Sequence, residues 1–290
     1  MLRRKINRAI QISMMDVGPE VFRPSPSRSP LSSYRNVRAL LSRLWIETVG
    51  KGLVTMKTSA PHIVSAFEDA LKRLKSAIVQ MAGAAETQID QALACLAQRN
   101  PELAREIVES DARLDSFEHD IEAHCMRLLA LRQPVADDLR EVVAALKIAG
   151  NLERIGDHAA NTAKRAVAIF SLADSAPLSG LPQLGRLVRE RLGTVIDAYV
   201  DGDGEAALRI WRTDDEVDAL YTSLVAEVER SALAAPDQFG AHMHLMMIAK
   251  NLERIGDHAT NIAEVVYFVS TGQALLDERP KADHSYDPAG

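Results

Sequence analysis

The stretch IAGNLERIGDHAANTA, residues 148–163, recurs almost unchanged as IAKNLERIGDHATNIA, residues 248–263. The two stretches are identical at thirteen of sixteen positions and lie one hundred residues apart. A match of this length indicates an internal duplication in which one helix has kept its residues while the surrounding sequence has diverged. We call the two stretches the signature segments.

Each signature segment places oxygen-bearing side chains four residues apart, which puts them on one face of an α-helix. Carboxylates at this spacing repel each other by a few tenths of a kcal/mol in an isolated helix. Arg154 and Arg254 directly follow the Glu and therefore do not face it, so a bound cation is the better compensation. The stripe comprises Glu153, Asp157 and Asn161 in the first copy and Glu253, Asp257 and Asn261 in the second.

A glycine lies inside each signature segment, three residues after the Glu. Glycine in a helix interior costs roughly 1 kcal/mol relative to alanine. We interpret Gly156 and Gly256 as points where a second helix, or a ligand held between helices, comes close to the backbone.

The composition predicts an all-α protein. Hydrophobic residues make up 47% of the 290 residues, aromatic residues only 4%, and no segment alternates as a strand would. Apolar residues recur at three- and four-residue intervals between Pro- or Gly-containing breaks, which predicts two tandem three-helix bundles. The expected helices run from His62 to Gln98, Pro101 to Leu131, Asp137 to Phe170, Leu184 to Val200, Gly204 to Ala234 and Phe239 to Thr271.

The domain limits follow from these breaks. The Ser-, Pro- and Gly-rich residues 171–182 separate a first repeat, 56–175, from a second, 182–273, and residues 274–290 are expected to form a disordered tail. Residues 1–55 form a basic extension unlike the rest. It fits a flexible or targeting segment, a basic amphipathic segment, or translated upstream sequence before a true start at Met56, and we favour the last.

The charge distribution limits the classes of molecule that the protein is expected to bind. Residues 1–55 carry ten Lys and Arg against three acids, about +7, so the remainder carries −6 − 7 = −13. An acidic body disfavours nucleic acid and favours cations or basic protein surfaces. Cys95 and Cys125 lack disulfide spacing, which predicts buried, reduced thiols in a cytoplasmic protein. No run reaches the eighteen or so apolar residues of a membrane span, so we expect membrane association only through a partner.

The middle helix of each repeat carries a second acidic pair, Asp111 and Asp115 or Asp214 and Asp218. In an antiparallel pair closed at Pro134, Asp111 lies twenty-three residues before the turn and Asp157 twenty-three after it, so the two share one height. Four carboxylates per repeat would then converge, either with raised pKa values or around a metal ion.

Oxygen ligands suit Mg, Ca, Mn or Fe, with Zn also compatible. His158 and His258 follow the Asp directly, point about 100° away, and are expected behind the ligands or at the surface. The predicted metal ligands are Asp111, Asp115, Glu153, Asp157, Asp214, Asp218, Glu253 and Asp257, with Glu118, Asn161 and Asn261 as additional candidates.

The repeated LERIGDHAxN, together with LLALRQPVADDLR (128–140) and DDEVDALY (214–221), resembles the PhoU family of phosphate-signalling proteins from Met56 to about Gly272. This resemblance implies two tandem three-helix bundles and an acidic E(D)xxxD motif that holds iron or zinc clusters in some members. It also implies a negative regulator of the phosphate regulon, a homodimer, which links a phosphate-specific ABC transporter to a sensor histidine kinase.

Two other functions remain open. A di-metal carboxylate enzyme would use carboxylates between antiparallel helices, but its Glu-x-x-His signature is missing after Glu153 and Glu253. Since no nucleophile with a paired base and no phosphate-binding glycine loop is visible, we expect no enzyme. A metal-free helical scaffold would dock a basic partner surface on the acidic stripe.

Overall fold

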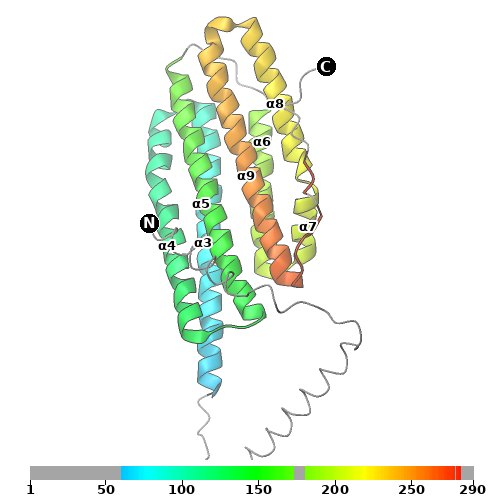
Figure 1. Cartoon of the computed structure of the whole chain (residues 1–290). Coiled ribbons are helices and arrows are strands. Elements are labelled where there is room, and N and C mark those ends of the chain that lie inside the picture. The colour runs from blue at the N-terminus through cyan, green and yellow to red at the C-terminus, as the bar shows by residue number, and fades with distance from the viewer. Residues whose placement is uncertain (1–59, 173–179, 278, 282–290) are drawn as a thin grey trace, which may run out of the picture. The chain divides into compact units, whose positions relative to one another are not determined.

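The computed structural model describes residues 60–172, 180–277 and 279–281. The predictions for residues 1–55 and for residues 282–290 lie outside the described residues. Within them the all-α prediction is confirmed, because the described part contains helices and no strand. The first repeat consists of α3 (Ala60–Gln98), α4 (Pro101–Arg132) and α5 (Asp137–Phe170), seen in cyan and green in Figure 1. The second consists of α6 (Leu181–Asp201), α7 (Gly204–Arg212), α8 (Asp215–Ala234), a short 3-10 helix, η1 (Pro236–Gln238), and α9 (Phe239–Thr271).

Local sequence explains most helix ends. The side chain of Asn100 accepts hydrogen bonds from the backbone N–H groups of Glu102 and Leu103, at 3.0 and 3.2 Å, and so caps α4. Pro101 occupies the first helical position, where a missing N–H costs nothing. Gly272 ends α9 with a φ of +72°, a left-handed conformation that glycine adopts without strain.

The second repeat differs from the prediction in its middle helix. We expected one helix from Gly204 to Ala234, but the structure divides it into α7 and α8 at Thr213 and Asp214. There the backbone hydrogen bonds change to the i→i+3 pattern of a 3-10 turn, and the carbonyl of Thr213 accepts a hydrogen bond from the buried Arg191 of α6. The interruption moves Asp214 from a helix interior to the residue before α8.

The two repeats share one core. Helices α5 and α9, which carry the signature segments, run antiparallel along each other in the centre of the molecule and make the most extensive contact between any two described helices (Figure 1). Buried apolar residues from both repeats belong to one continuous cluster, with Ile155 and Ile255 fully buried in it. The bundles are therefore fused along the two helices that carry the signature segments.

The signature glycines lie where helices approach closely, as predicted. A Cβ at Gly156 would collide with the side chain of Leu114 on α4 and lie 2.9 Å from the Gln88 Oε1 on α3. A Cβ at Gly256 would lie 2.9 Å from Val217 on α8. The absence of a side chain at these positions lets the middle helix pack against the signature helix.

Candidate metal centres

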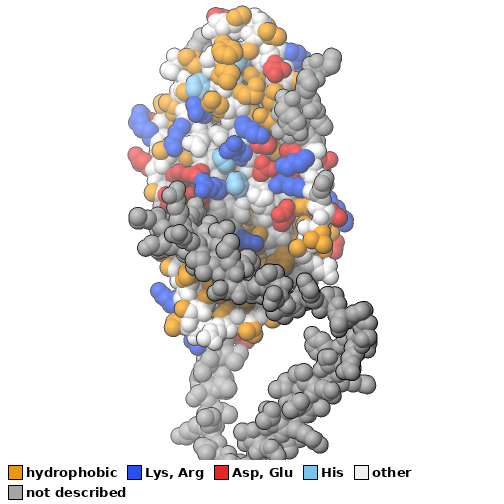
Figure 2. Space-filling model, viewed as in Figure 1, with side chains coloured by type: hydrophobic (Ala, Val, Ile, Leu, Met, Phe, Trp, Pro, Cys, Tyr) orange, Lys and Arg blue, Asp and Glu red, His pale blue; other side chains and the backbone are white. Residues whose placement is uncertain are grey.

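Charged side chains gather in a band across the middle of the face that α4, α5, α9 and α8 form (Figure 2). The two predicted acidic clusters lie on these helices or directly beside them, one in each repeat. We call them the first cluster, on α4 and α5, and the second cluster, on α9 and at the start of α8.

The first cluster brings its carboxylates together across the α4–α5 contact. Burial is the largest cause that raises the pKa of Asp111, and the charges of Asp157 and Asp115 raise it further. The pKa of Glu153 is raised by burial first and then by Asp157, and Glu118 and Asp115 add to this effect. A Cβ at Gly156 would lie 3.5 Å from Asp111 Oδ1, so Asp111 of α4 lies level with the residue that precedes Asp157 on α5. This position agrees with the predicted height of Asp111 beside Asp157.

Positive charge near the first cluster is modest. Arg154 lies 3.4 Å from Glu153 and 3.5 Å from Asp157, and its side chain is 49% exposed. The charge of Lys164 lowers the pKa of Asp111 without reversing its upward shift. An exposed ion pair at such distances contributes about 0–1 kcal/mol. The first cluster is thus a group of under-compensated carboxylates.

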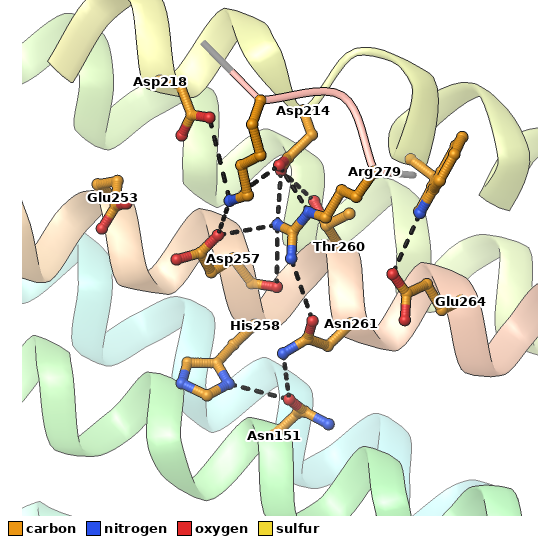
Figure 3. A network of polar contacts seen from close by, with 12 residues as sticks. Asn151, Asp214, Asp218, Glu253, Asp257, His258, Thr260, Asn261, Glu264 and Arg279 are labelled. Carbon is orange, nitrogen blue, oxygen red and sulfur yellow. Dashed lines mark hydrogen bonds and ion pairs between the residues drawn. The ribbon is translucent and has the colours of Figure 1, made fainter. Parts of the chain in front are cut away.

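The second cluster is compensated by a residue that the sequence prediction assigned to the disordered tail. Arg279 donates to both oxygens of Asp214, at 2.6 and 2.8 Å, and to Asp257 Oδ1 at 2.9 Å (Figure 3). The remaining nitrogen of the guanidinium group, Nη1, donates to Asn261 Oδ1 at 3.2 Å. A guanidinium group that spans two carboxylates in this way fixes their separation.

A second cation from the same segment completes the arrangement. The Lys281 ammonium lies 2.7 Å from Asp257, 3.4 Å from Asp214 and 4.0 Å from Asp218. The ammonium therefore contacts carboxylates of both α9 and the α7–α8 turn. Three of the four predicted ligands of this repeat surround one cationic group.

These cations change the protonation of the second cluster. Burial opposes the ionisation of Asp214, but hydrogen bonds from Arg279 and Thr260, together with the charges of Arg279 and Lys281, outweigh it and hold the pKa of Asp214 below its ordinary value. Glu253 differs, since burial raises its pKa and the hydrogen bond from Lys250 only partly offsets this. Asp214 is therefore held as a carboxylate although only 1% of it is exposed.

Each repeat also holds a buried side-chain oxygen without a hydrogen-bond partner. One is Gln88 Oε1, which faces Gly156 near Asp111, and the other is Glu253 Oε2. Both residues are less than 5% exposed. A buried acceptor without a donor costs about 1–3 kcal/mol, which a cation beside it would relieve. The carboxylate and amide oxygens of the clusters are therefore the type of ligand atom that hard or borderline cations prefer.

The geometry of a metal centre is not preformed. Among residues 60–172, 180–277 and 279–281, no three His, Cys, Asp or Glu side chains are arranged so that they could hold a metal ion. Carboxylates without an ion between them repel each other, so binding would require side-chain rotations in each cluster.

The signature histidines lie beside the clusters, at the contact of α5 and α9. The rings of His158 and His258 stack with centroids 5.6 Å apart. The His258 Nδ1 lies 2.9 Å from the Asn151 Oδ1, within hydrogen-bonding distance across the two repeats. The histidines thus join the two repeats, consistent with a position behind the predicted ligands.

Comparison with known proteins agrees with this architecture. The family model described as "PhoU domain" matches the chain twice, at residues 78–166 and 181–266. The chain belongs to the PhoU family. Its two PhoU domains correspond to the two three-helix repeats, which confirms the fold predicted from the signature segments.

Several PhoU proteins are similar over most of their length. A "phosphate-specific transport system accessory protein PhoU homolog" of Caulobacter vibrioides is 44% identical over 224 residues, which cover 77% of this chain and 97% of that protein. The protein of the same description from Zymomonas mobilis is 44% identical over 214 residues, 74% of this chain and 90% of that protein. The crystal structure of PhoU from Pseudomonas aeruginosa has a TM-score of 0.69 and 31% identity, and the match covers 71% of this chain and 100% of that one.

The structure places the additional candidates of this PhoU protein in different settings. Glu118 belongs to the first cluster, since its Oε1 would lie 3.5 Å from a Cβ at Gly150 and its charge acts on Glu153. Asn161 is exposed on α5, one turn beyond Asp157. Asn261 Oδ1 accepts a hydrogen bond from Arg279, which in turn binds Asp214 and Asp257.

Sequence reasoning missed four residues that contact or complete the clusters: Gln88, Thr260, Arg279 and Lys281. Thr260 is fully buried and donates to Asp214 at 2.7 Å. The only signal for the tail residues was a pair of basic residues shortly after the last helix of an acidic protein. That signal is weak because a charge pair in a terminal segment is usually solvated.

Proposed function

We propose that this chain is an accessory protein of a phosphate-specific transport system. It acts without catalysis, as a cytoplasmic helical adaptor between the phosphate ABC transporter and the sensor histidine kinase of the phosphate regulon, and keeps the regulon repressed when phosphate is plentiful. The observation that carries this proposal is 44% identity to an accessory protein of that description over 97% of its length.

The described structure is consistent with an adaptor. No helix in the described part of the chain is long and apolar enough to cross a membrane. Met126, Leu131, Val135 and Leu139 are exposed large apolar residues near the α4–α5 turn. We propose that these side chains contact the transporter protein, so that association with the membrane occurs through the transporter itself. A homodimer is part of the proposal and is tested by the mass of the purified protein in solution.

The regulatory role is tested by deleting the gene in its host and measuring a phosphatase reporter at high phosphate. We expect the reporter to be expressed in the deletion strain and repressed again when the full chain is restored. Repression that persists without the gene would exclude the regulatory role. Deletion of the transporter, tested in parallel, should also release the reporter, whereas deletion of the sensor kinase in the strain that lacks the gene should silence the reporter again.

We further propose that the acidic clusters bind metal ions through carboxylate oxygens. Asp111, Asp115, Glu153 and Asp157 would hold an ion in the first cluster, and Asp214, Asp218, Glu253 and Asp257 in the second. A bound divalent or trivalent ion, iron or zinc among them, would supply positive charge that braces α4 against α5 and α8 against α9. The under-compensated carboxylates of the first cluster and the two buried oxygens without partners support the proposal.

Metal binding is tested by the metal content of protein purified without chelator. Glu153→Ala removes a ligand of the first cluster, and we expect it to reduce the metal bound per chain. Asp257→Ala removes a ligand of the second cluster, and we expect it to reduce whatever metal that cluster holds. An undiminished metal content in both variants would remove these clusters as metal sites. Peroxidase or ferroxidase turnover by the metal-loaded protein would instead favour the di-metal carboxylate enzyme.

A further inference from the structure

The two clusters have the same carboxylates at corresponding positions but different cationic surroundings. Arg279 is only 17% exposed and occupies the space between Asp214 and Asp257 (Figure 3). Both oxygens of Asp214 already accept hydrogen bonds from its guanidinium group, and Oδ1 also accepts one from Thr260. A metal ion on these oxygens would have to displace the guanidinium group.

The sequence gives the first cluster no equivalent segment. The residues that follow α5, SLADSAPLSGLPQ at 171–183, contain no Lys or Arg, whereas Arg279-Pro280-Lys281 follows the end of α9 after seven intervening residues. The duplication therefore preserved the carboxylates of both repeats, but only the second signature helix is followed by nearby cations.

Charge repulsion prevents a metal ion and the side-chain cations of Arg279 and Lys281 from occupying the second cluster together. A divalent ion at Asp257 would lie within a few ångströms of the Lys281 ammonium, which is 2.7 Å from the same carboxylate. Like charges at such a distance inside a partly buried site repel strongly. The segment and the ion therefore compete for one set of oxygens.

We propose that Arg279 and Lys281 are the resident cations of the second cluster and exclude metal from it, so that the first cluster fills with metal first. The inference rests on the proposed metal binding. Arg279 and Lys281 then determine which repeat binds a metal ion and how many metal ions the chain holds. Metal reaches the second cluster only when the 279–281 segment leaves it.

The test uses Mn²⁺ as the probe, equilibrium dialysis and elemental analysis of the full chain. In a background with Asp111→Asn and Asp115→Asn, which disables the first cluster, we expect little Mn²⁺ on the chain. Adding Arg279→Gln and Lys281→Gln should restore binding with at least about tenfold higher affinity, equivalent to about 1.4 kcal/mol. Arg73→Gln with Arg127→Gln in the same background removes the same charge elsewhere and should restore nothing.

A milder variant guards against misfolding of the quadruple variant. Lys281 is 46% exposed, so Lys281→Gln alone leaves the fold in place and should raise Mn²⁺ affinity in the same direction by a smaller factor. Unchanged affinity in both tail variants, with the wild type binding Mn²⁺ through its first cluster, would overturn this inference and leave the metal proposal standing. Absence of Mn²⁺ from every chain would overturn both.

Discussion

His158 of the first repeat and His258 of the second stack against each other at the centre of the α5–α9 contact, with ring centroids 5.6 Å apart and planes inclined by 28°. Their positions correspond in the two signature segments, so the same residue meets its own duplicate across the contact. Two imidazolium ions could not occupy this arrangement without strong repulsion. The contact therefore requires that the two histidines are neutral.

This pair predicts a loss of stability in mild acid. Burial, followed by the charges of the opposite histidine and nearby arginines, lowers the pKa of His258 to about 4, and burial and Arg254 lower that of His158. The unfolded chain protonates near the ordinary value of 6.5, whereas the folded chain resists protonation. The stabilising effect of the neutral pair is complete above pH 6.5 and is lost as the pH falls toward 4.

The measurement is thermal unfolding of the metal-free protein between pH 7 and 4. His258→Gln retains a hydrogen-bonding side chain but cannot be protonated, so its unfolding temperature should fall less steeply than that of the wild type over this range. Parallel profiles for the two proteins would contradict the assignment.

The buried hydroxyl of Thr260 is expected to stabilise the second repeat. Thr260→Val keeps the shape of the side chain but removes a hydrogen bond to Asp214, a carboxylate that is 1% exposed. We expect a loss of about 1–3 kcal/mol in the free energy of unfolding, because the buried acceptor loses a donor. Urea denaturation of the wild type and of Thr260→Val measures this loss.

Thr162→Val is the matched control, since Thr162 is equally buried but donates only to the carbonyl of His158 in its own helix. Equal losses of unfolding free energy in the two variants would show that the hydrogen bond to Asp214 contributes no more than a hydrogen bond within a helix.

Close helix packing at Gly256 makes alanine unfavourable there. A Cβ would lie 2.9 Å from Val217 and 3.3 Å from Val188, and both neighbours are β-branched and stiff. Overpacking costs about 1–3 kcal/mol, against about 1 kcal/mol gained from helix propensity, so we expect Gly256→Ala to lower the free energy of unfolding by about 1 kcal/mol.

Gly83 provides the comparison, because it is an exposed glycine inside α3 with no atom within 4 Å of a Cβ. Gly83→Ala should stabilise the protein by about 1 kcal/mol in the same denaturation experiment. Equal stabilisation by both substitutions would contradict tight packing at Gly256.

Arg191 is expected to hold the turn between α7 and α8. It is 6% exposed, donates to the carbonyl of Thr213 and forms a 3.0 Å ion pair with Glu216. Arg191→Met should cost about 1–3 kcal/mol in the free energy of unfolding, since it removes the side-chain donor to that carbonyl and the partner of Glu216, and leaves only the Glu216 N–H on the carbonyl.

Arg189 is the control on the same helix. It is 41% exposed and lies 3.6 Å from Glu86 and 3.4 Å from Asp90, so Arg189→Met should cost at most about 1 kcal/mol. A similar cost for both substitutions would argue against a structural role for the buried arginine.

Much of the fold was predictable because its determinants are local. Prolines and glycines end the helices, and Asp137–Phe170 and Phe239–Thr271 were predicted with the bounds that the structure shows. Counting residues outward from Pro134 was enough to bring Asp111 level with Asp157, since antiparallel helices of equal rise keep register.

The missed features depend on contacts distant in sequence. The α7–α8 turn contains neither proline nor glycine, and it is held by Arg191, which lies twenty-two residues before Thr213. Arg279 contacts Asp214 across sixty-five residues from a segment without periodicity. The acidic pattern predicted that a cation was needed, but it could not tell a metal ion from a side chain.

The continuous core shared by the two repeats has a thermodynamic consequence. Because buried side chains of α3 to α9 belong to one cluster, the halves are expected to melt in a single cooperative transition. An ion captured in either half then raises the melting temperature of the whole molecule by mass action. A thermal shift can therefore report that a ligand has bound, but only substitutions confined to one half can say where.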